Sequence, residues 1–232
     1  MAPPPDIAGP ILLSLQVGGA AALLGLPAAV GLGFMLARRS FPGHGLVGAL
    51  LLAPMVLPPV VTGLLLLDLV GRATVIGGWL AAHGLPLSFS FEAAVLAALV
   101  VGLPLYVWSC RAAFEAVDPR LEELSLTLGQ PPLRTFRRVT LPLALPGLAA
   151  GAVLAFARGL GEFGATAVLA GNVEGETRTI ALAVYHLLEA PGGEAASRGL
   201  VIASVALSVA ALLSFEALNR WQRRRLELDR GR

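Results

Sequence analysis

The chain has 232 residues, of which 56% are hydrophobic and 14% charged, against roughly 45–50% and roughly 25% in soluble domains, so most of it is expected to lie in lipid. All 17 basic residues are arginine, and the absence of lysine excludes a phosphate-binding loop and a Schiff-base enzyme on this chain. One cysteine excludes an internal disulfide, three separated histidines show no metal-ligand spacing, and a net charge of +2 is too small to indicate nucleic acid.

Five apolar segments predict an all-α integral membrane protein with about five transmembrane helices, forming a single domain over residues 1–232. A helix needs roughly 20 apolar residues to cross the hydrocarbon core. Pro54, Pro58 and Pro59 interrupt the second segment, which is tolerated where neighbouring helices or water satisfy the freed carbonyls. The connection after it, 72–91, is expected to be an external loop with a short interfacial helix, and a helix near 179–189 need not span. The expected spans are 11–37, 46–67, 93–110, 143–164 and 200–218.

The longest polar segment, 111–142, is expected to begin with a short amphipathic helix. Asp118 and Pro119 are typical of a helix start, because the carboxylate caps free N–H groups and proline has none to lose. Gly129 is typical of a helix end, and the prolines that follow it force a corner. Residues spaced three and four apart between these points form one narrow, mostly apolar stripe: Leu121, Leu124, Ser125 and Leu128.

A second short helix is expected after this corner. Its apolar and basic residues fall on opposite sides, with Leu133, Phe136 and Val139 against Arg134, Arg137 and Arg138. Pro142 is expected to start the next span. Two short amphipathic helices at a sharp angle, placed between two spans, favour a docking surface for another protein.

The distribution of arginine predicts how the chain is oriented. Segments 37–45, 111–142 and 219–232 hold two, five and six arginines, whereas the opposite side holds Arg72, Arg178 and Arg198. Cytoplasmic loops carry the excess of basic residues. We therefore expect the 111–142 loop and the C-terminus in the cytoplasm and the N-terminus outside, in a multi-pass protein of the cell (inner) membrane.

The polar segment resembles the EAA loop of ABC importer permeases. Glu123-Leu124-Ser125 is followed after three residues by Gly129 and after nine more by Val139-Thr140-Leu141-Pro142, as in E-A-A-x3-G-x9-I-x-L-P. The two alanines are here Leu and Ser, so the packing of this helix departs from the family pattern. The resemblance implies that the loop sits in a cleft of a cytoplasmic ATPase subunit, through Glu123, Leu124, Ser125, Gly129, Leu133, Leu141 and Pro142.

Two ionisable residues fall inside the fourth expected span. Arg158 and Glu162 are four residues apart, hence on one helix face and able to pair. An unpaired charge in lipid costs roughly 2.5–3.5 kcal/mol on insertion scales, so the pair should face the bundle interior or a wet cavity. It is either an ionic staple between helices or a group that helps an anion to pass.

The run from Arg158 to Asn172, RGLGEFGATAVLAGN, resembles the molybdate branch of the oxyanion importers. Pro58–Gly63 and Arg38–Gly43 are also similar to that branch. The resemblance implies an ABC type I importer permease fold and the membrane subunit of an ATP-driven molybdate importer. It further implies separate cytoplasmic ATPase subunits, an external oxyanion-binding protein, and no cofactor, metal or catalytic group on this chain.

Several alternatives remain open at the level of sequence. Five helices are few to enclose a path, so two copies should form a homodimer in the lipid with the path between them. Thr62 is a candidate hydroxyl for the anion, or else it bonds its own i−4 carbonyl. The anion could be tungstate, sulfate or thiosulfate in place of molybdate. An ion-coupled carrier without an ATPase would be expected to show internal repeats, and an intramembrane enzyme would need a nucleophile–base pair or a metal set.

Overall fold

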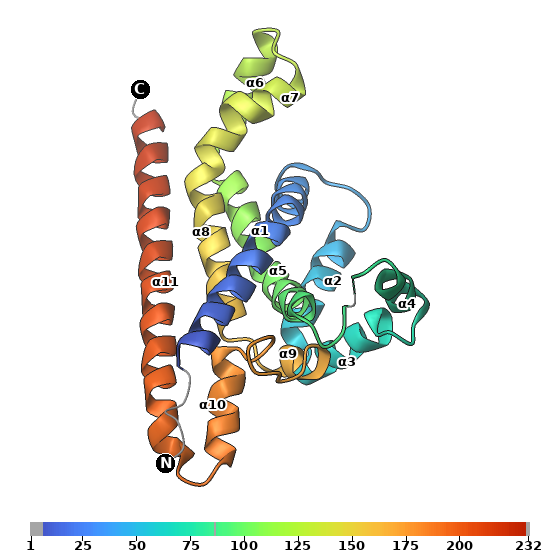
Figure 1. The fold of residues 1–232 in the computed structure, drawn as a ribbon. Helices are drawn as coiled ribbons and strands as arrows, with labels where there is room; N and C mark the ends of the chain where they lie inside the picture. Colours follow the sequence, from blue (N-terminus) through green and yellow to red (C-terminus); the bar gives the residue numbers. More distant parts are fainter. Residues whose placement is uncertain (1–6, 86, 231–232) are drawn as a thin grey trace.

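The computed structural model describes residues 7–85 and 87–230, the last six of these as backbone only. Residues 1–6 and the last two residues of the arginine-rich tail lie outside the described residues. Over the described ranges the chain is nearly all helical and has no β-strand, which confirms the predicted all-α class. The helices, labelled in Figure 1, are α1 (Ala8–Arg38), α2 (His44–Val56), α3 (Pro59–Val70), α4 (Val75–Ala82), α5 (Phe91–Glu115), α6 (Pro119–Thr127), α7 (Pro132–Thr135), α8 (Leu141–Leu160), α9 (Gly164–Leu169), α10 (Ile180–Glu189) and α11 (Gly193–Arg230).

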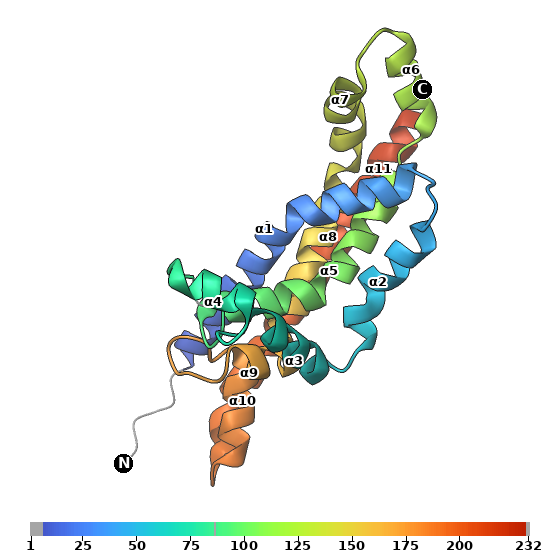
Figure 2. The same ribbon diagram turned by 90° about the vertical axis from the view of Figure 1, so that its right-hand side faces the viewer.

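Helices α1, α5 and α8 form the centre of the molecule (Figure 2). Their contacts are made largely by small side chains, and on α5 Ala93, Ala94, Ala97 and Ala98 are almost fully buried. In lipid, helices associate by close van der Waals packing because burial of apolar surface gives no advantage over lipid tails. Alanine allows the backbones to approach closely, so this composition favours a compact three-helix centre.

The last helix, α11, lies along one side of this centre and packs mainly on α8 and α10 (Figure 1). Most of its apolar side chains face outward, as a helix surface against lipid requires. Near its far end the buried side chain of Gln222 donates from Nε2 to the Ala113 carbonyl of α5, at 3.4 Å. Helix α11 contains the expected range 200–218 and continues beyond it.

Four helices among the described residues are long and apolar enough to cross a membrane, or five if the bent pair α2–α3 counts as one span. The pair is bent by 110°, at the prolines that interrupt the expected span 46–67 in the sequence. Leu57 is extended with ψ 143°, as a residue before proline must be, and Pro59 is the first residue of α3. The consecutive prolines therefore make a corner and not merely a kink.

The second short helix expected after Gly129 is not separate. Residues 132–160 form one continuous helix of 29 residues, with a π-turn at Phe136–Thr140 between α7 and α8. In this turn the Leu141 N–H donates to the Phe136 carbonyl five residues earlier. The wide turn accommodates Pro142, which has no N–H to give, so Pro142 is the second residue of α8 and still lies within the continuous helix 132–160.

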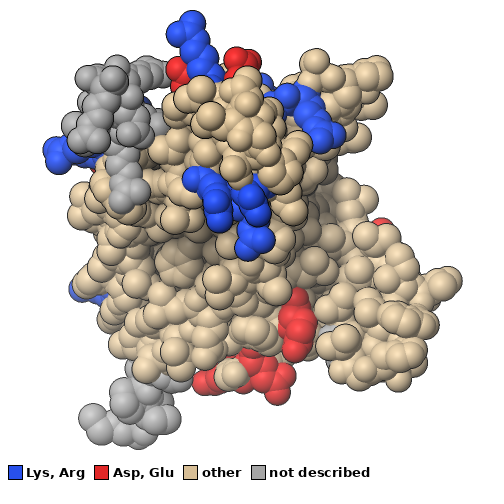
Figure 3. All heavy atoms as spheres, turned by 90° about the horizontal axis from the view of Figure 1, so that it is seen from above, with Lys and Arg blue, Asp and Glu red and all other residues tan. Residues whose placement is uncertain are grey.

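The ends that carry most arginines lie together. Helices α6 and α7, the C-terminal end of α1 and the end of α11 are at one end of the bundle, and α10 is at the other (Figures 1 and 2). Figure 3 looks onto the α6–α7 end, where several arginine side chains stand among mostly uncharged atoms. The segments that the arginine count assigned to one side thus share one end of the molecule.

Candidate functional site

Helix α6 begins and ends as the sequence predicts. The Asp118 carboxylate accepts a hydrogen bond from the Arg120 N–H at 3.0 Å, and Pro119 is the first helical residue. Gly129 has a φ of +81°, and its N–H donates to the Leu126 carbonyl at 2.9 Å. The next N–H reaches back five residues at 3.2 Å, which completes a Schellman ending. These two ends fix a helix of nine residues in a defined position.

The outward surface of α6 and α7 is apolar. Leu124, Leu128 and Leu133 are 59%, 73% and 70% exposed. Ser125, which the sequence placed in the same stripe, instead lies 2.9 Å from the Thr135 hydroxyl and joins α6 to α7. Large leucines left in contact with solvent at the polar end of a protein mark a binding surface. We call the surface formed by Leu124, Leu128 and Leu133 the leucine patch.

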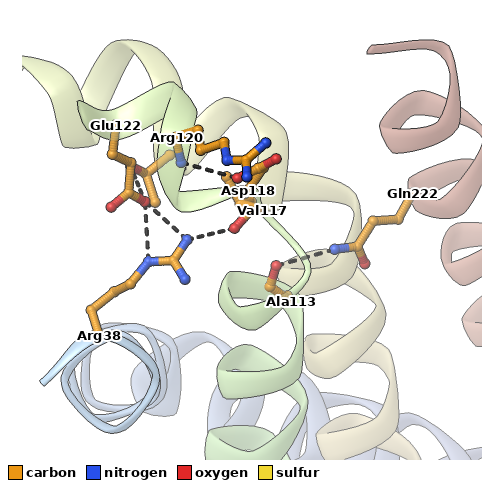
Figure 4. Close-up of polar contacts among 8 residues, drawn as sticks. Arg38, Ala113, Val117, Asp118, Arg120, Glu122 and Gln222 are labelled. Carbon is orange, nitrogen blue, oxygen red and sulfur yellow. Dashed lines mark hydrogen bonds and ion pairs between the residues drawn. The ribbon is translucent and has the colours of Figure 1, made fainter. Parts of the chain in front are cut away.

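Two adjacent glutamates of α6 have different surroundings. Glu123 is exposed, whereas Glu122 forms an ion pair with Arg38 at the end of α1, with 3.0 Å between Nη2 and Oε1 (Figure 4). Thr140 also donates to Glu122, at 2.9 Å. The sequence analysis did not single out Glu122, and it used Arg38 only in the arginine count and in the Arg38–Gly43 resemblance. The partner of Glu122 lies 84 positions away in the sequence, so no local pattern indicated the contact.

Leu141 and Pro142, the last anchors of the sequence motif, lie at the start of α8 below the π-turn. Leu141 is partly buried and packs against the hydrophobic cluster formed by α1, α5 and α8, while Pro142 is exposed. Phe136, just before them, stacks edge-on against Phe34 of α1 with ring centroids 4.9 Å apart. The motif therefore runs without interruption from the exposed leucine patch into the packed centre of the bundle.

The expected pair inside the fourth span is present, at a helix break. Arg158 Nη1 lies 2.9 Å from Glu162 Oε2, and the two side chains are 30% and 2% exposed. Helix α8 ends at Leu160, and the other carboxylate oxygen of Glu162 accepts from the Ala165 N–H at 2.9 Å. The expected continuous range 143–164 is thus interrupted before its end. Glu162 joins the end of α8 to the start of α9.

Helix α3 packs directly on α9. A Cβ on Gly63 would lie 2.9 Å from the Ala165 Cα, and one on Gly164 would lie 2.8 Å from the Pro59 Cβ, so both glycines are needed for this approach. The structure therefore brings together the two sequence runs PPVVTG and GEFGAT. Thr62 is 4% exposed, and its hydroxyl has no hydrogen-bond partner within the described part of the chain. The alternative that Thr62 bonds its own i−4 carbonyl is wrong.

The two groups of candidate residues are far apart. The leucine patch and Glu123 lie at the α6 end, and Arg158 and Glu162 lie at the far end of α8. With 20 residues in α8 and a rise of 1.5 Å per residue, the separation along the helix is about 30 Å. Among the described residues, no group of three or more acidic, histidine or cysteine side chains could hold a metal.

Comparison with known proteins links this arrangement to membrane transport. Residues 29–228 match the family described as binding-protein-dependent transport system inner membrane component. The molybdenum transport system permease protein ModB of Escherichia coli K12 is 48% identical over 219 residues, covering 93% of this chain and 94% of that protein. ModB of Haemophilus influenzae is 43% identical over 217 residues, covering 93% and 95%.

Solved structures agree on the fold. The methionine ABC transporter MetNI, in an inward-facing conformation, superposes with a TM-score of 0.69 at 19% identity, covering 92% of this chain and 93% of that one. A bacterial alginate ABC transporter, in complex with an alginate-bound periplasmic protein, gives 0.64 at 20% identity and covers 94% and 78%. Both are ABC transporters, and at this identity they establish the architecture alone.

Proposed function

Since the chain belongs to the family of binding-protein-dependent transport system inner membrane components, we propose that it is the membrane subunit of an ATP-driven importer of molybdate. The chain is a permease subunit with a multi-pass membrane fold. The assignment of molybdate is supported by near full-length similarity to permeases named for molybdenum transport. Tungstate and sulfate are the competing anions in the test below.

The exposure of the leucine patch is the observation that supports a role of this chain in coupling to an ATPase. The patch stands beside Glu123 on a helix fixed at both ends, and it has no covering element among the described residues. A cytoplasmic ATPase subunit would take the apolar side chains into a cleft and meet Glu123 with a basic or hydrogen-bonding group. ATP hydrolysis belongs to that partner, because this chain has no lysine for a phosphate-binding loop.

The transport path would be formed by two copies of the chain. Apolar side chains of α3, among them Val60, Leu64 and Leu65, are about half exposed, while Thr62 on the same helix is buried. A second copy of α3 meeting this face would give a symmetric interface with the path between the copies. The α6–α7 end would be cytoplasmic, in accordance with its arginines, and a binding protein would deliver the anion at the α10 end.

Within the bundle, Glu162 would be structural and Arg158 the more accessible partner. Glu162 uses one carboxylate oxygen for Arg158 and the other for the Ala165 N–H, so its charge is fully engaged in holding α8 to α9. The Arg158 side chain is 30% exposed and is partly neutralised by Glu162. This favours a staple at the helix break over a strong anion site, which would release its anion too slowly.

Purification of the complex tests this function. The chain is expressed with its ATPase, reconstituted, and given a binding protein loaded with molybdate, tungstate or sulfate. We expect two copies of the chain with two ATPase subunits, and ATP hydrolysis that molybdate stimulates. Stimulation by sulfate in preference to molybdate would move the chain to another anion. A complex that contains one permease chain would overturn the dimer.

A further inference from the structure

The ion pair between α1 and α6 is a built contact within the protein. The side chains of Arg38 and Glu122 are only 14% and 18% exposed, although both lie at the polar end of the molecule. Arg38 donates from Nε and Nη2 to one oxygen of Glu122, at 3.2 and 3.0 Å. An exposed surface pair would hold its partners loosely, whereas a mostly buried guanidinium with two fixed acceptor atoms holds its geometry.

Arg38 also binds the backbone that leads into α6. Its Nη2 donates to the Val117 carbonyl at 2.8 Å (Figure 4), and Val117 is fully buried between the end of α5 and the start of α6. One guanidinium thus holds the connection before α6 as well as a side chain in its first turn. Movement of α6 as a rigid body would therefore act on Arg38 at two points.

A third element meets the same carboxylate. Thr140, in the π-turn that leads into α8, donates from Oγ1 to Glu122 Oε1 at 2.9 Å and is 1% exposed. Glu122 thereby connects α6 to the start of α8 as well as to the end of α1. We call the set Arg38, Glu122, Thr140 and the Val117 carbonyl the inner joint.

The opposite end of α1 is attached to the other side of the bundle. The Ser14 hydroxyl accepts from the Ile180 N–H, the first residue of α10, at 2.8 Å, and both residues are buried. Helix α1 has 31 residues and therefore extends about 46 Å. It is the element that contacts the inner joint at one end and α10 at the other.

We propose that Arg38 is the positioning residue that transmits movement of α6 to α1, through the inner joint, and so to the α10 end of the bundle. This inference rests on the proposed function, in which an ATPase binds α6 through the leucine patch and Glu123. The two adjacent glutamates then have different roles. Glu123 faces the partner, and Glu122 faces the bundle. Loss of the inner joint leaves the ATPase bound but its movement poorly transmitted.

The test measures coupling separately from binding. Arg38→Gln, Arg38→Lys and Thr140→Val are compared with Arg39→Gln, which changes the neighbouring exposed arginine. For each complex, reconstituted with its ATPase and loaded binding protein, we measure the molybdate transported per ATP hydrolysed and the amount of ATPase that co-purifies. Thr140→Val removes one hydroxyl without changing size, so it reports on the inner joint even if the arginine variant accumulates poorly.

Arg38→Gln is expected to retain its ATPase and to lower transport per ATP by about fivefold or more, the lower end of coupling between distant sites. Thr140→Val should lower it less, Arg38→Lys should recover part of it, and Arg39→Gln should match the wild type. Equal coupling ratios in Arg38→Gln, Thr140→Val and Arg39→Gln would overturn the proposal. So would a loss of ATPase binding that accounts for the whole loss of transport. A wild-type complex without anion-stimulated hydrolysis would refute the importer function itself.

Discussion

Gly129→Ala is expected to weaken ATPase binding and to leave the helix bundle intact. The φ of Gly129 is +81°, and a Cβ added there meets no atom within 4 Å, so the cost comes from the backbone alone. A left-handed conformation costs an L-residue about 1–2 kcal/mol. This cost shifts the equilibrium from the Schellman ending toward other conformations of residue 129 by about 5- to 30-fold. Because α6 is exposed at its Gly129 end, this loss of the helix ending is expected to leave the leucine patch less firmly oriented.

The assay is titration of the purified permease in lipid discs with its ATPase. The apparent Kd for the ATPase should rise by up to about 30-fold, while the thermal unfolding of the permease should not change. The apparent Kd of Gly129→Asn for the ATPase should lie between those of the wild type and Gly129→Ala, because asparagine tolerates the left-handed region.

Gly175→Ala provides a matched control. Gly175 has a φ of +78° and equally open surroundings, but it lies in the turn before α10, away from α6. This variant should carry the same strain and bind the ATPase normally. If Gly129→Ala binds as tightly as the wild type, or if both variants lose binding equally, the Schellman ending of α6 does not position the docking surface and the reasoning fails.

Two further predictions concern orientation and the membrane pair. In permease expressed without its ATPase, Leu128→Cys should be labelled by a membrane-impermeant reagent only after the cells are opened. Val75→Cys, at a position that is 90% exposed on α4, should be labelled in intact cells. The reverse pattern would invert the proposed topology. Arg158→Met alone should destabilise the permease by about 3 kcal/mol in a denaturation series, because it leaves Glu162 buried without its partner. The further change Glu162→Gln keeps an acceptor for the Ala165 N–H and should restore much of the stability. A double variant that folds well but transports nothing would show that the pair acts in the path.

The local structure of α6 could be predicted because its signals are local. Asp118 and Pro119 at one end and Gly129 at the other act through the backbone within a few residues, and the structure has the cap, the helix and the left-handed turn at those positions. The motif of which Glu123 and Gly129 are part also has fixed spacing, and the family match confirms the family that it indicated. The presence of a pair between Arg158 and Glu162 followed in the same way from a spacing of four.

Other features depend on contacts between distant segments. Proline predicts a break after Leu57, but neither its angle of 110° nor the close packing of α3 on α9 follows from a local pattern. The π-turn before Pro142 keeps α7 and α8 continuous, where proline alone suggested a new start. The ion pair of Glu122 joins residues 84 positions apart, so no local pattern distinguishes its role from that of Glu123.

Uptake into proteoliposomes distinguishes an ATP-driven importer from an ion-coupled carrier. The chain is reconstituted with its ATPase oriented so that ATP is supplied at the α6–α7 side, a molybdate-loaded binding protein is added on the other side, and radioactive molybdate is counted with and without an imposed ion gradient. Uptake is expected to require ATP and to persist when every ion gradient is collapsed. Uptake driven by a gradient in the absence of ATP would contradict this expectation and would identify the chain as an ion-coupled carrier.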